Sequence, residues 1–579
     1  MLLYFVQSIS FAHSQWSVLD EGNYIYKGWL FASGQYIQYQ AYGPLTNHMP
    51  LSYLIFGWVQ LIFGPGLRTV RYFMVAVGCI FMLGMWLTTR RLAGRWAAAA
   101  SLWFIALNPF PISDYSIAIS EGVVACLLTW ILFFILGENR SPRQLLLGSL
   151  LTGIVILIRE NMILVLPVIV LYMLWQHGKK ASLIFTVTVA AFFISAHVIF
   201  WPGIMEVWDR WIPNNIRPLF NGLVFQDYAT PLNAPIEQKV FILFSSVKTN
   251  FMAIFSALAV WLSWPKKGFK NPAQFKMIVF LSVIFVGLYI AHAVASLGKN
   301  YCAFCLVNYV TFFSPAAILM FFAFLPGIKE RQPLFPAWLA GALIVLLLAG
   351  VGYSNYENFG QSLAAINLPR AGGNVELWRL LINKFGLDFQ TQRRLLPIVA
   401  GALIGAGSII VGFLISRANK IRAVHTLLGT TLILGLILSP TSLLGSVGGV
   451  CNKDIIRGYE IVGAELAQRI KPGAQIYWRG DASPAPLLYL KNIKIYPPQL
   501  NAFFSFKSRS DSDRALRYGF WNGKLDAQWR AEADVILIRE SEYPALQKQL
   551  SSPRYIELQA TSPTYACTDD SGIRIFERK

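Results

Sequence analysis

Residues Leu145 to Gln176 read LLLGSLLTGIVILIRENMILVLPVIVLYMLWQ, and this segment is the strongest indication of how the chain folds. As one helix it would be about 48 Å long, well beyond the hydrocarbon core of a bilayer, which is about 30 Å thick. The charged pair Arg159-Glu160 interrupts the run near its middle, and basic clusters lie at both ends. We therefore expect two short membrane spans, with Arg159 and Glu160 at the outer turn between them.

The rest of the chain has the same apolar character. Of its 579 residues, 55% are hydrophobic and only 13% are charged, which is too apolar for a soluble protein of this size. Apolar runs recur as far as about Pro440, each followed by a turn or a charge cluster. We expect a mainly α-helical, polytopic membrane protein with about thirteen transmembrane helices. The first run, residues 1–13, is short for a span, and we expect a truncated start.

The net charge of +20 follows the expected topology. Basic residues gather in alternate short loops: Arg90, Arg91 and Arg95; Arg140 and Arg143; Lys179 and Lys180; Lys266, Lys267, Lys270 and Lys276; Lys329 and Arg331; Arg417, Lys420 and Arg422. By the positive-inside rule these loops are cytoplasmic, and the C-terminal tail lies outside. We therefore expect a multi-pass protein of the plasma (inner) membrane. No basic face or aromatic-interleaved patch indicates a nucleic-acid partner.

Two domains are expected from the change in composition. Residues 1–450 would form the membrane domain, and residues 451–579 a small extracytoplasmic α/β domain. Three outer segments of the membrane domain are long: residues 15–50, 201–239 and 353–395. They mix Trp and Tyr with charges, which predicts short interfacial helices.

The tail shows the periodicities of an α/β fold. Ile455 to Ile470 is helical, and Ala474 to Trp478, Ala533 to Ile538 and Gly572 to Phe576 resemble short strands. The tail contains no glycine-rich phosphate loop, metal-ligand spacing or nucleophile elbow. We therefore expect an accessory or acceptor-side domain rather than the catalytic one.

Four of the six cysteines raise the question of pairing. Cys451 and Cys567 lie at opposite ends of the tail; they could pair in an oxidising compartment or remain thiols. Cys302 and Cys305 have the spacing of a redox or metal motif, but no second pair accompanies them. Two buried thiols one helical turn apart are the simpler interpretation.

The adjacent acids Asp20 and Glu21 lie just past the first apolar run. Carboxylates at a membrane boundary lose hydration, which raises their pKa and makes them better proton acceptors. Composition alone favours an ordinary solvated pair. The motifs that follow in the sequence favour a catalytic role for this pair.

Those motifs are YGPLTNHMPLSY at residues 42–53, FGPGLRTVR at residues 63–71, Asn108-Pro109, Ser120-Glu121 and Ile158-Arg159-Glu160. With the acid pair, they resemble the GT-C glycosyltransferases, specifically the branch that contains the protein O-mannosyltransferases (family 39) and the bacterial aminoarabinose transferases. The resemblance covers about residues 20–167. The motifs are short, and they specify the superfamily better than the substrate.

The resemblance implies a hexosyl- or pentosyltransferase that uses a polyprenyl-phosphate sugar donor. Asp20 would be the general base that deprotonates the acceptor, supported by Glu21. The acceptor, a cell-envelope glycan, lipid or protein, would attack the anomeric carbon and expel the lipid phosphate with inversion. This chemistry requires no cofactor. Some relatives bind a divalent metal near the loop acids, so a divalent metal is possible here too, although no His-rich ligand set demands one.

Arg159 is the candidate for binding the leaving phosphate, because charges in membrane segments tend to be paired or functional and relatives place Lys or Arg at this turn. The alternative is an Arg159-Glu160 pair that only caps the hairpin. His48 is predicted either to orient donor phosphate or acceptor, or to make a structural hydrogen bond.

Three further residues are weaker candidates for substrate binding. Asp114 and Glu121 flank one short outer turn, where Glu121 could merely complement a helix dipole. Arg217, in the second long loop, is a second phosphate contact or an ordinary surface arginine. Asn308 stands where many relatives have Arg, which argues against donor binding there.

Two other functional classes compete with the glycosyltransferase. A transporter or flippase of a lipid-linked substrate should show internal repeats and broken midplane helices with paired ionisable residues. The two halves of the chain show no convincing repeat, and the charges cluster at the outer boundary. A non-catalytic membrane scaffold would have no need of the acid pair, His48 and Arg159 together.

Overall fold

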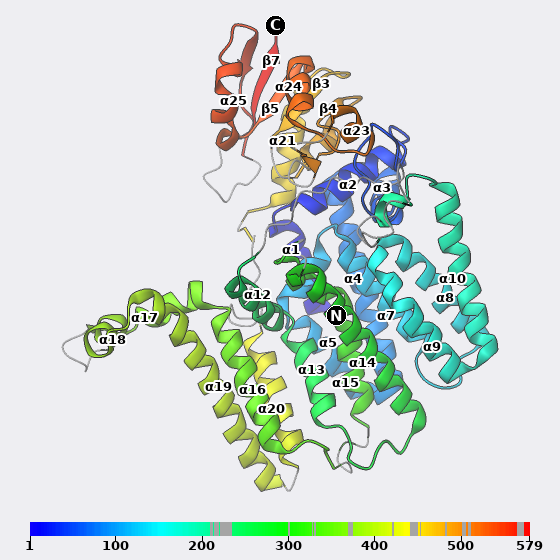
Figure 1. The fold of residues 1–579 in the computed structure, drawn as a ribbon, viewed down its shortest axis with the longest axis vertical. Coiled ribbons are helices and arrows are strands. Elements are labelled where there is room, and N and C mark those ends of the chain that lie inside the picture. Colours follow the sequence, from blue (N-terminus) through cyan, green and yellow to red (C-terminus); the bar gives the residue numbers. More distant parts are fainter. Residues whose placement is uncertain are drawn as a thin grey trace.

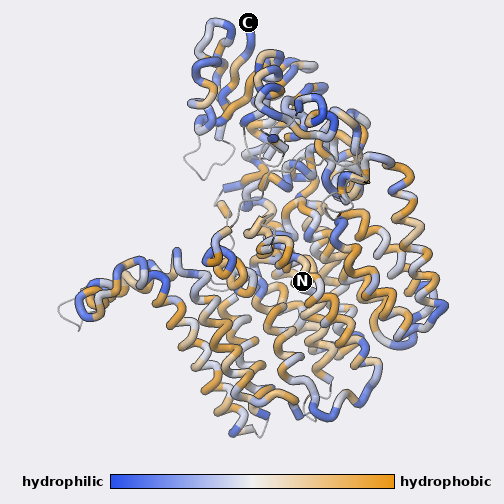
Figure 2. Tube along the Cα trace, in the orientation of Figure 1, coloured by the Kyte–Doolittle hydropathy of each residue, from blue (hydrophilic) through white to orange (hydrophobic). Residues whose placement is uncertain are grey.

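The protein is a bundle of apolar helices with a small sheet domain at one end (Figure 1). The computed structural model describes residues 1–208, 212, 219, 234–298, 302–326, 328, 332–368, 375–419, 422–439, 450–451, 453–480, 483–500, 505–507, 511–563 and 572–579. The bundle is predominantly hydrophobic (Figure 2).

The first part of the bundle contains eleven helices, several of which end at glycine. Their bounds are α1 Leu2–Ser14, α2 Leu19–Ala32, α3 Leu51–Phe63, α4 Leu67–Ala93, α5 Arg95–Ala106, α6 Pro109–Ser116, α7 Ser120–Ile135, α8 Pro142–Ile158, α9 Val165–His177, α10 Lys179–Ile199 and α11 Met205–Trp208. Gly94 and Gly178 follow α4 and α9 with φ of 88° and 87°, a region that glycine adopts without strain. Ser141 and Gln144 form a capping box at the start of α8.

The second part of the bundle contains α12 Ile236–Thr249, α13 Phe251–Leu262, α14 Pro272–Ala293, α15 Cys305–Phe324, α16 Ala337–Tyr353, α17 Gln361–Ala364, α18 Leu377–Phe385, α19 Phe389–Asn419 and α20 Ala423–Leu438. Two single-turn π-helices, η4 Val294–Gly298 and η6 Tyr356–Gly360, and a two-stranded ribbon, β1 Asn367–Leu368 with β2 Val375–Glu376, complete it. Figure 1 shows α16, α19 and α20 as one group, with α17 and α18 extending sideways from its upper end.

The expected number of about thirteen spans is not confirmed. Within the described residues, six helices are long and apolar enough to cross a membrane, or eight if two bent pairs each count as one span. The pairs α6–α7 and α12–α13 bend by 107° and 86°. Further apolar helices, among them α3, α8, α16 and α20, are shorter. Counting the apolar runs in the sequence therefore overestimates the number of full-length spans.

The break between two helices at Arg159 lies where the sequence predicted it. Helix α8 ends at Ile158, a 3-10 turn, η1, covers Glu160–Leu164, and α9 begins at Val165. The long outer segments contain short helices, as predicted: α2 lies in the first, α11 in the second, and α17 and α18 in the third.

The C-terminal part forms a five-stranded sheet of order β4-β3-β5-β7-β6. Its strands are β3 Gln475–Arg479, β4 Lys494–Tyr496, β5 Val535–Ile538, β6 Tyr555–Leu558 and β7 Arg574–Arg578. Its helices are α21 Ile455–Arg469, η7 Ala485–Tyr489, α23 Ser512–Arg517, α24 Gly523–Glu532, η8 Glu540–Glu542 and α25 Tyr543–Leu550. Strand β3 runs parallel to β4 and β5, whereas β7 is antiparallel to β5 and β6. The predicted helix and strands are present, and the sequence analysis missed β4 and β6.

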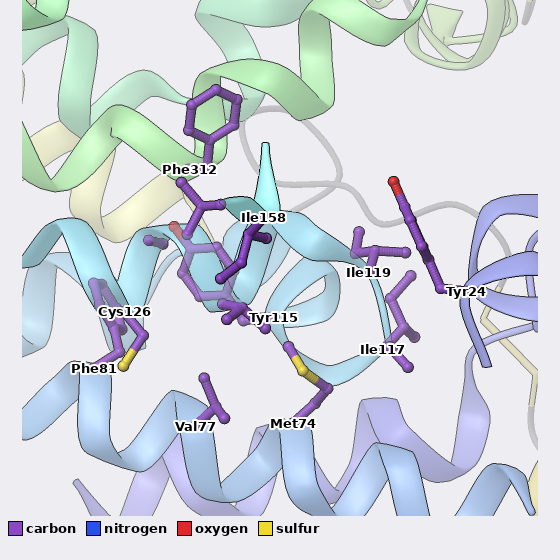
Figure 3. Packing of buried hydrophobic residues seen from close by; sticks show 14 of the residues in the cluster. Tyr24, Met74, Val77, Phe81, Tyr115, Ile117, Ile119, Cys126, Ile158 and Phe312 are labelled. Carbon is purple, nitrogen blue, oxygen red and sulfur yellow. The ribbon is translucent and has the colours of Figure 1, made fainter. Parts of the chain in front are cut away.

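A large hydrophobic core joins the helices of the first part of the bundle with α14 and α15, and a second core joins α13 to α16 and α20. Figure 3 shows part of the large core, with Met74 and Phe81 of α4, Tyr115 of α6 and Phe312 of α15. The rings of Phe81 and Tyr115 meet edge to face at 5.2 Å, and the Tyr115 hydroxyl donates to the carbonyl of Thr311 at 2.6 Å. This packing fixes α6 and α15 relative to each other below the site described next.

The structure corrects one of the predictions about the cysteines. Cys302 and Cys305 form a disulfide, so the interpretation as two buried thiols is wrong. Cys451 is also disulfide-bonded, and Cys567, the partner considered for it, lies outside the described residues. Cys79 and Cys126 are free thiols.

Candidate active site

Asp20 and Glu21 lie in the first turn of α2, where negative side chains complement the helix dipole. Adjacent residues of an α-helix point about 100° apart, so the two carboxylates face different surroundings. Asp20 is an exposed residue, whereas the side chain of Glu21 is completely buried.

Glu21 is held by the bundle through both of its carboxylate oxygens. Arg71 of α4 donates to them from Nε at 2.9 Å and from Nη2 at 2.7 Å. The backbone N–H of Ala118 donates to Oε1 at 2.9 Å, and Arg71 Nη1 donates to the carbonyls of Ala12 and Gln15 at 2.6 and 2.8 Å. Glu21 therefore anchors α2, and Asp20 is the acid of the pair that remains accessible to a substrate.

Asp20 lies within the field of several charged groups. Although its side chain is accessible, the surrounding protein removes much of its hydration, and this loss together with the charge of Glu121 raises the pKa of Asp20. The charges of His48, Arg159 and Lys27 act in the opposite direction. A carboxylate with a raised pKa is a stronger base than an ordinary Asp.

Arg159 is fixed by two neighbouring elements. Its Nη1 donates to Glu121 Oε1 at 2.5 Å and to Ser120 Oγ at 2.9 Å, both at the start of α7. Its guanidinium carbon lies 5.2 Å from the ring centre of Tyr309 and 5.0 Å from that of Phe312, on α15. The guanidinium is therefore held between an acid and two aromatic rings, with 12% of its side chain exposed.

His48 approaches the same turn from the first outer loop. Its Nδ1 lies 3.7 Å from Glu160 Oε2, and its ring lies 5.7 Å from that of Tyr24 and 6.2 Å from that of Tyr53. The Tyr39 hydroxyl donates to the His48 carbonyl at 2.6 Å. The loop, α2 and the Arg159 turn therefore converge on one region.

The three weaker candidates differ in position. Glu121 is the ion-pair partner of Arg159. Asp114 of α6 is buried, and its Oδ2 has no hydrogen-bond partner among the described residues. Arg217 lies outside the described residues.

Lys27 and the pair of Asn161 and His292 belong to this region and were not singled out from the sequence. Lys27 lies seven residues after Asp20 on α2, is 2% exposed, and donates from Nζ to the carbonyl of Leu45 at 2.9 Å. Burial lowers the pKa of Lys27 to about 7. Asn161 Nδ2 and His292 Nε2 lie 2.7 Å apart. The one sequence feature that could have identified Lys27 is its spacing from Asp20, which corresponds to two helical turns.

The chemistry of the site is that of an accessible carboxylate and a cation at the end of an apolar bundle that faces the C-terminal domain. In the part of the chain that the structure describes, no three His, Cys, Asp or Glu side chains form a group that could hold a metal ion. The arrangement can accept a proton at Asp20 and stabilise an anion at Arg159.

Part of the chain that includes most of this region matches a known protein family. Residues 47–201 match the family model described as dolichyl-phosphate-mannose-protein mannosyltransferase, a segment that includes His48, Glu121 and Arg159 and begins after Asp20. No curated protein matches the chain.

Two solved structures have the same fold. ArnT from Cupriavidus metallidurans bound to undecaprenyl phosphate has a TM-score of 0.53 and 15% identity, over 99% of this chain and 96% of that chain. ArnT from the same organism in the apo state has a TM-score of 0.50 and 16% identity, over 99% and 95%. The predicted resemblance to the GT-C superfamily is thus confirmed by the family model and by the fold.

Proposed function

We propose that this protein transfers a sugar from a polyprenyl-phosphate donor to a cell-envelope glycan, lipid or protein acceptor. The observation that carries the proposal is the convergence of an accessible acid, Asp20, with the fixed cation Arg159 at the outer ends of α2, α7 and α8. The family model is that of an enzyme with a dolichyl-phosphate sugar donor, and ArnT binds undecaprenyl phosphate, which support a lipid-phosphate donor here.

In the proposed reaction, Asp20 accepts the proton of the acceptor hydroxyl. The acceptor oxygen attacks the anomeric carbon of the sugar from the side opposite the phosphate. The bond between this carbon and the phosphate oxygen breaks, and polyprenyl phosphate leaves with the bonding electron pair. The product glycoside has the inverted anomeric configuration.

Arg159 has the geometry to stabilise the leaving phosphate. Both of its hydrogen bonds among the described residues come from Nη1, so Nε and Nη2 remain for phosphate oxygens. Tyr309 and Phe312 hold the guanidinium plane in a fixed orientation. A guanidinium that is already oriented stabilises developing negative charge without reorganisation during the reaction. His48 would contact the phosphate or acceptor from the other side.

The site would face the exterior of the plasma (inner) membrane, together with the C-terminal domain. The basic short loops support this orientation, and so do the disulfides at Cys302–Cys305 and Cys451, because disulfides persist in oxidising compartments.

The proposed reaction is tested by the configuration of the product. Purified protein in lipid nanodiscs is supplied with a polyprenyl-phosphate sugar of known anomeric configuration, and the product linkage is determined by NMR. Inversion supports direct attack by the acceptor. Retention would contradict it, and movement of intact donor across the bilayer without bond cleavage would favour a flippase.

A further inference from the structure

The C-terminal domain contacts the beginning of the first outer loop through backbone and side-chain hydrogen bonds. Val450 pairs with Gln15 as an antiparallel bridge, and the N–H of Cys451 donates to the carbonyl of Ser14 at 2.7 Å. His13 Nδ1 lies 2.9 Å from Asp454 Oδ1, the side chain that caps α21. Figure 1 shows α21 and the sheet directly above α2.

A second contact joins Ser483 to the start of α2 and to Ser17 just before it. The hydroxyls of Ser483 and Ser17 lie 2.8 Å apart, and both side chains are buried. Gly22 faces Ser483 and Pro484 so closely that an added Cβ would overlap Ser483 Oγ and lie 2.5 Å from Pro484 Cδ. Glycine weakens a helix interior, so its presence here is explained by this contact.

The two sides of the first turn of α2 are therefore held by different parts of the protein. Arg71 holds Glu21 from the bundle, and Ser483 with Pro484 presses on Gly22 from the C-terminal domain. Asp20 lies beside both anchors, and its own side chain is exposed. The direction in which Asp20 points is thus set jointly by the two domains.

The same domain also contacts the loop near His48. The Tyr42 hydroxyl donates to Asp513 Oδ1 at 3.1 Å, and the N–H of Tyr42 donates to the carbonyl of Arg517 at 3.4 Å. Leu45 packs in a small cluster with Phe520. The C-terminal domain thus touches the loop both before and after the part that carries Asp20.

We propose that Ser483 and Pro484 are positioning residues for Asp20, so that the C-terminal domain is a part of the catalytic apparatus rather than only a surface for the acceptor. The proposal rests on the proposed function, because it requires Asp20 to act as the base. A base displaced by about 1 Å can lose on the order of 100-fold in rate, whereas donor binding at Arg159 does not depend on this contact.

The experiment uses Gly22→Ala and Ser483→Ala in the full-length protein, with sugar transfer measured as kcat and donor KM over a range of pH. Gly22→Ala inserts a methyl group into the contact, and Ser483→Ala removes the hydrogen bond to Ser17 together with a longer one, at 3.4 Å, from the N–H of Ala485. Gly407→Ala is the matched control, because it adds a methyl group to helix α19 where no atom lies within 4 Å. Thermal unfolding in detergent confirms folding of each variant.

We expect kcat of Gly22→Ala to fall on the order of 100-fold and that of Ser483→Ala about fivefold, with donor KM unchanged and the acid limb of the pH profile displaced. Gly407→Ala should behave as wild type. If Gly22→Ala fails to fold, Ser483→Ala alone decides. The proposal is wrong if the folded variants match Gly407→Ala, or if KM and kcat change together. Absence of transfer by the wild type from every donor would instead overturn the proposed function.

Discussion

Arg71 and Glu21 form a completely buried ion pair directly beside the accessible Asp20. Two hydrogen bonds join the guanidinium to the carboxylate, and the remaining nitrogen of Arg71 binds two carbonyls in the chain segment that precedes α2. A single side chain of α4 thus fixes both the helix that carries the candidate base and its entry segment.

Arg71→Met should destabilise the protein strongly. The substitution leaves the carboxylate of Glu21 buried without its partner, and breaking a buried ion pair in this way costs about 3–5 kcal/mol. Arg68→Met is the control, because Arg68 and Glu460 form a partly exposed pair worth about 0–1 kcal/mol. The midpoint temperature of thermal unfolding, measured in one detergent, should fall strongly for Arg71→Met and only slightly for Arg68→Met. Equal falls in this temperature would show that the buried pair contributes no more to stability than the partly exposed pair.

The rate of sugar transfer should fall as pH is lowered through the pKa of Asp20, because a protonated carboxyl cannot accept the acceptor's proton. Since burial and Glu121 raise this pKa, the midpoint of the acid limb should lie above 3.8, the ordinary value for Asp. The measurement is kcat/KM against pH in nanodiscs.

Two substitutions should move this limb in opposite directions. Glu121→Gln removes a negative charge that raises the pKa of Asp20, so its midpoint should move to lower pH. His48→Gln removes a charge that lowers the pKa, so its midpoint should move to higher pH. Shifts of the same sign in both variants would refute the assignment of the limb to Asp20.

Substitution of Arg159 should weaken donor binding. Arg159→Ala loses a charged hydrogen-bond donor, which typically contributes about 1.5–3 kcal/mol, so donor KM should rise roughly 10- to 100-fold. Arg159→Lys keeps the charge but not the planar fork, and should lie between wild type and Arg159→Ala. Arg379→Ala on α18, an exposed arginine, is the control. If neither donor KM nor kcat differed from wild type, the donor phosphate would be excluded as the partner of Arg159.

The proposed orientation predicts labelling by a membrane-impermeant maleimide. Lys471→Cys, in the C-terminal domain and 87% exposed, should react in intact cells. Lys267→Cys, in the loop between α13 and α14, should react only after permeabilisation. The reverse pattern would place the site in the cytoplasm.

Much of the architecture could be predicted because it depends on local composition. A charged pair within an apolar run predicted the break at Arg159 and Glu160, since such charges belong at the membrane boundary. Short strand-like runs predicted β3, β5 and β7 of the C-terminal domain, whereas β4 and β6 were missed. The number of spans could not be predicted, because hydropathy does not reveal that α6 and α7 meet at 107°.

The contacts of the site depend on partners distant in the sequence. Arg71 and Glu21 are 50 residues apart, and Ser483 is more than 400 residues from Gly22, so no local pattern pairs them. The spacing of Cys302 and Cys305 fits two thiols as well as the disulfide that the structure contains. The resemblance of short motifs brought Asp20, His48 and Arg159 together, and their roles stay predictions.

The most direct test is transfer of radiolabelled sugar from a panel of polyprenyl-phosphate sugars in membranes that contain wild type, Asp20→Asn or Arg159→Ala. Asp388→Asn is the matched control, because Asn also caps the start of α19. We predict transfer by wild type and Asp388→Asn, loss of transfer in Asp20→Asn, and a raised donor KM in Arg159→Ala. Full transfer by correctly inserted Asp20→Asn would contradict the assignment of Asp20 as the catalytic base.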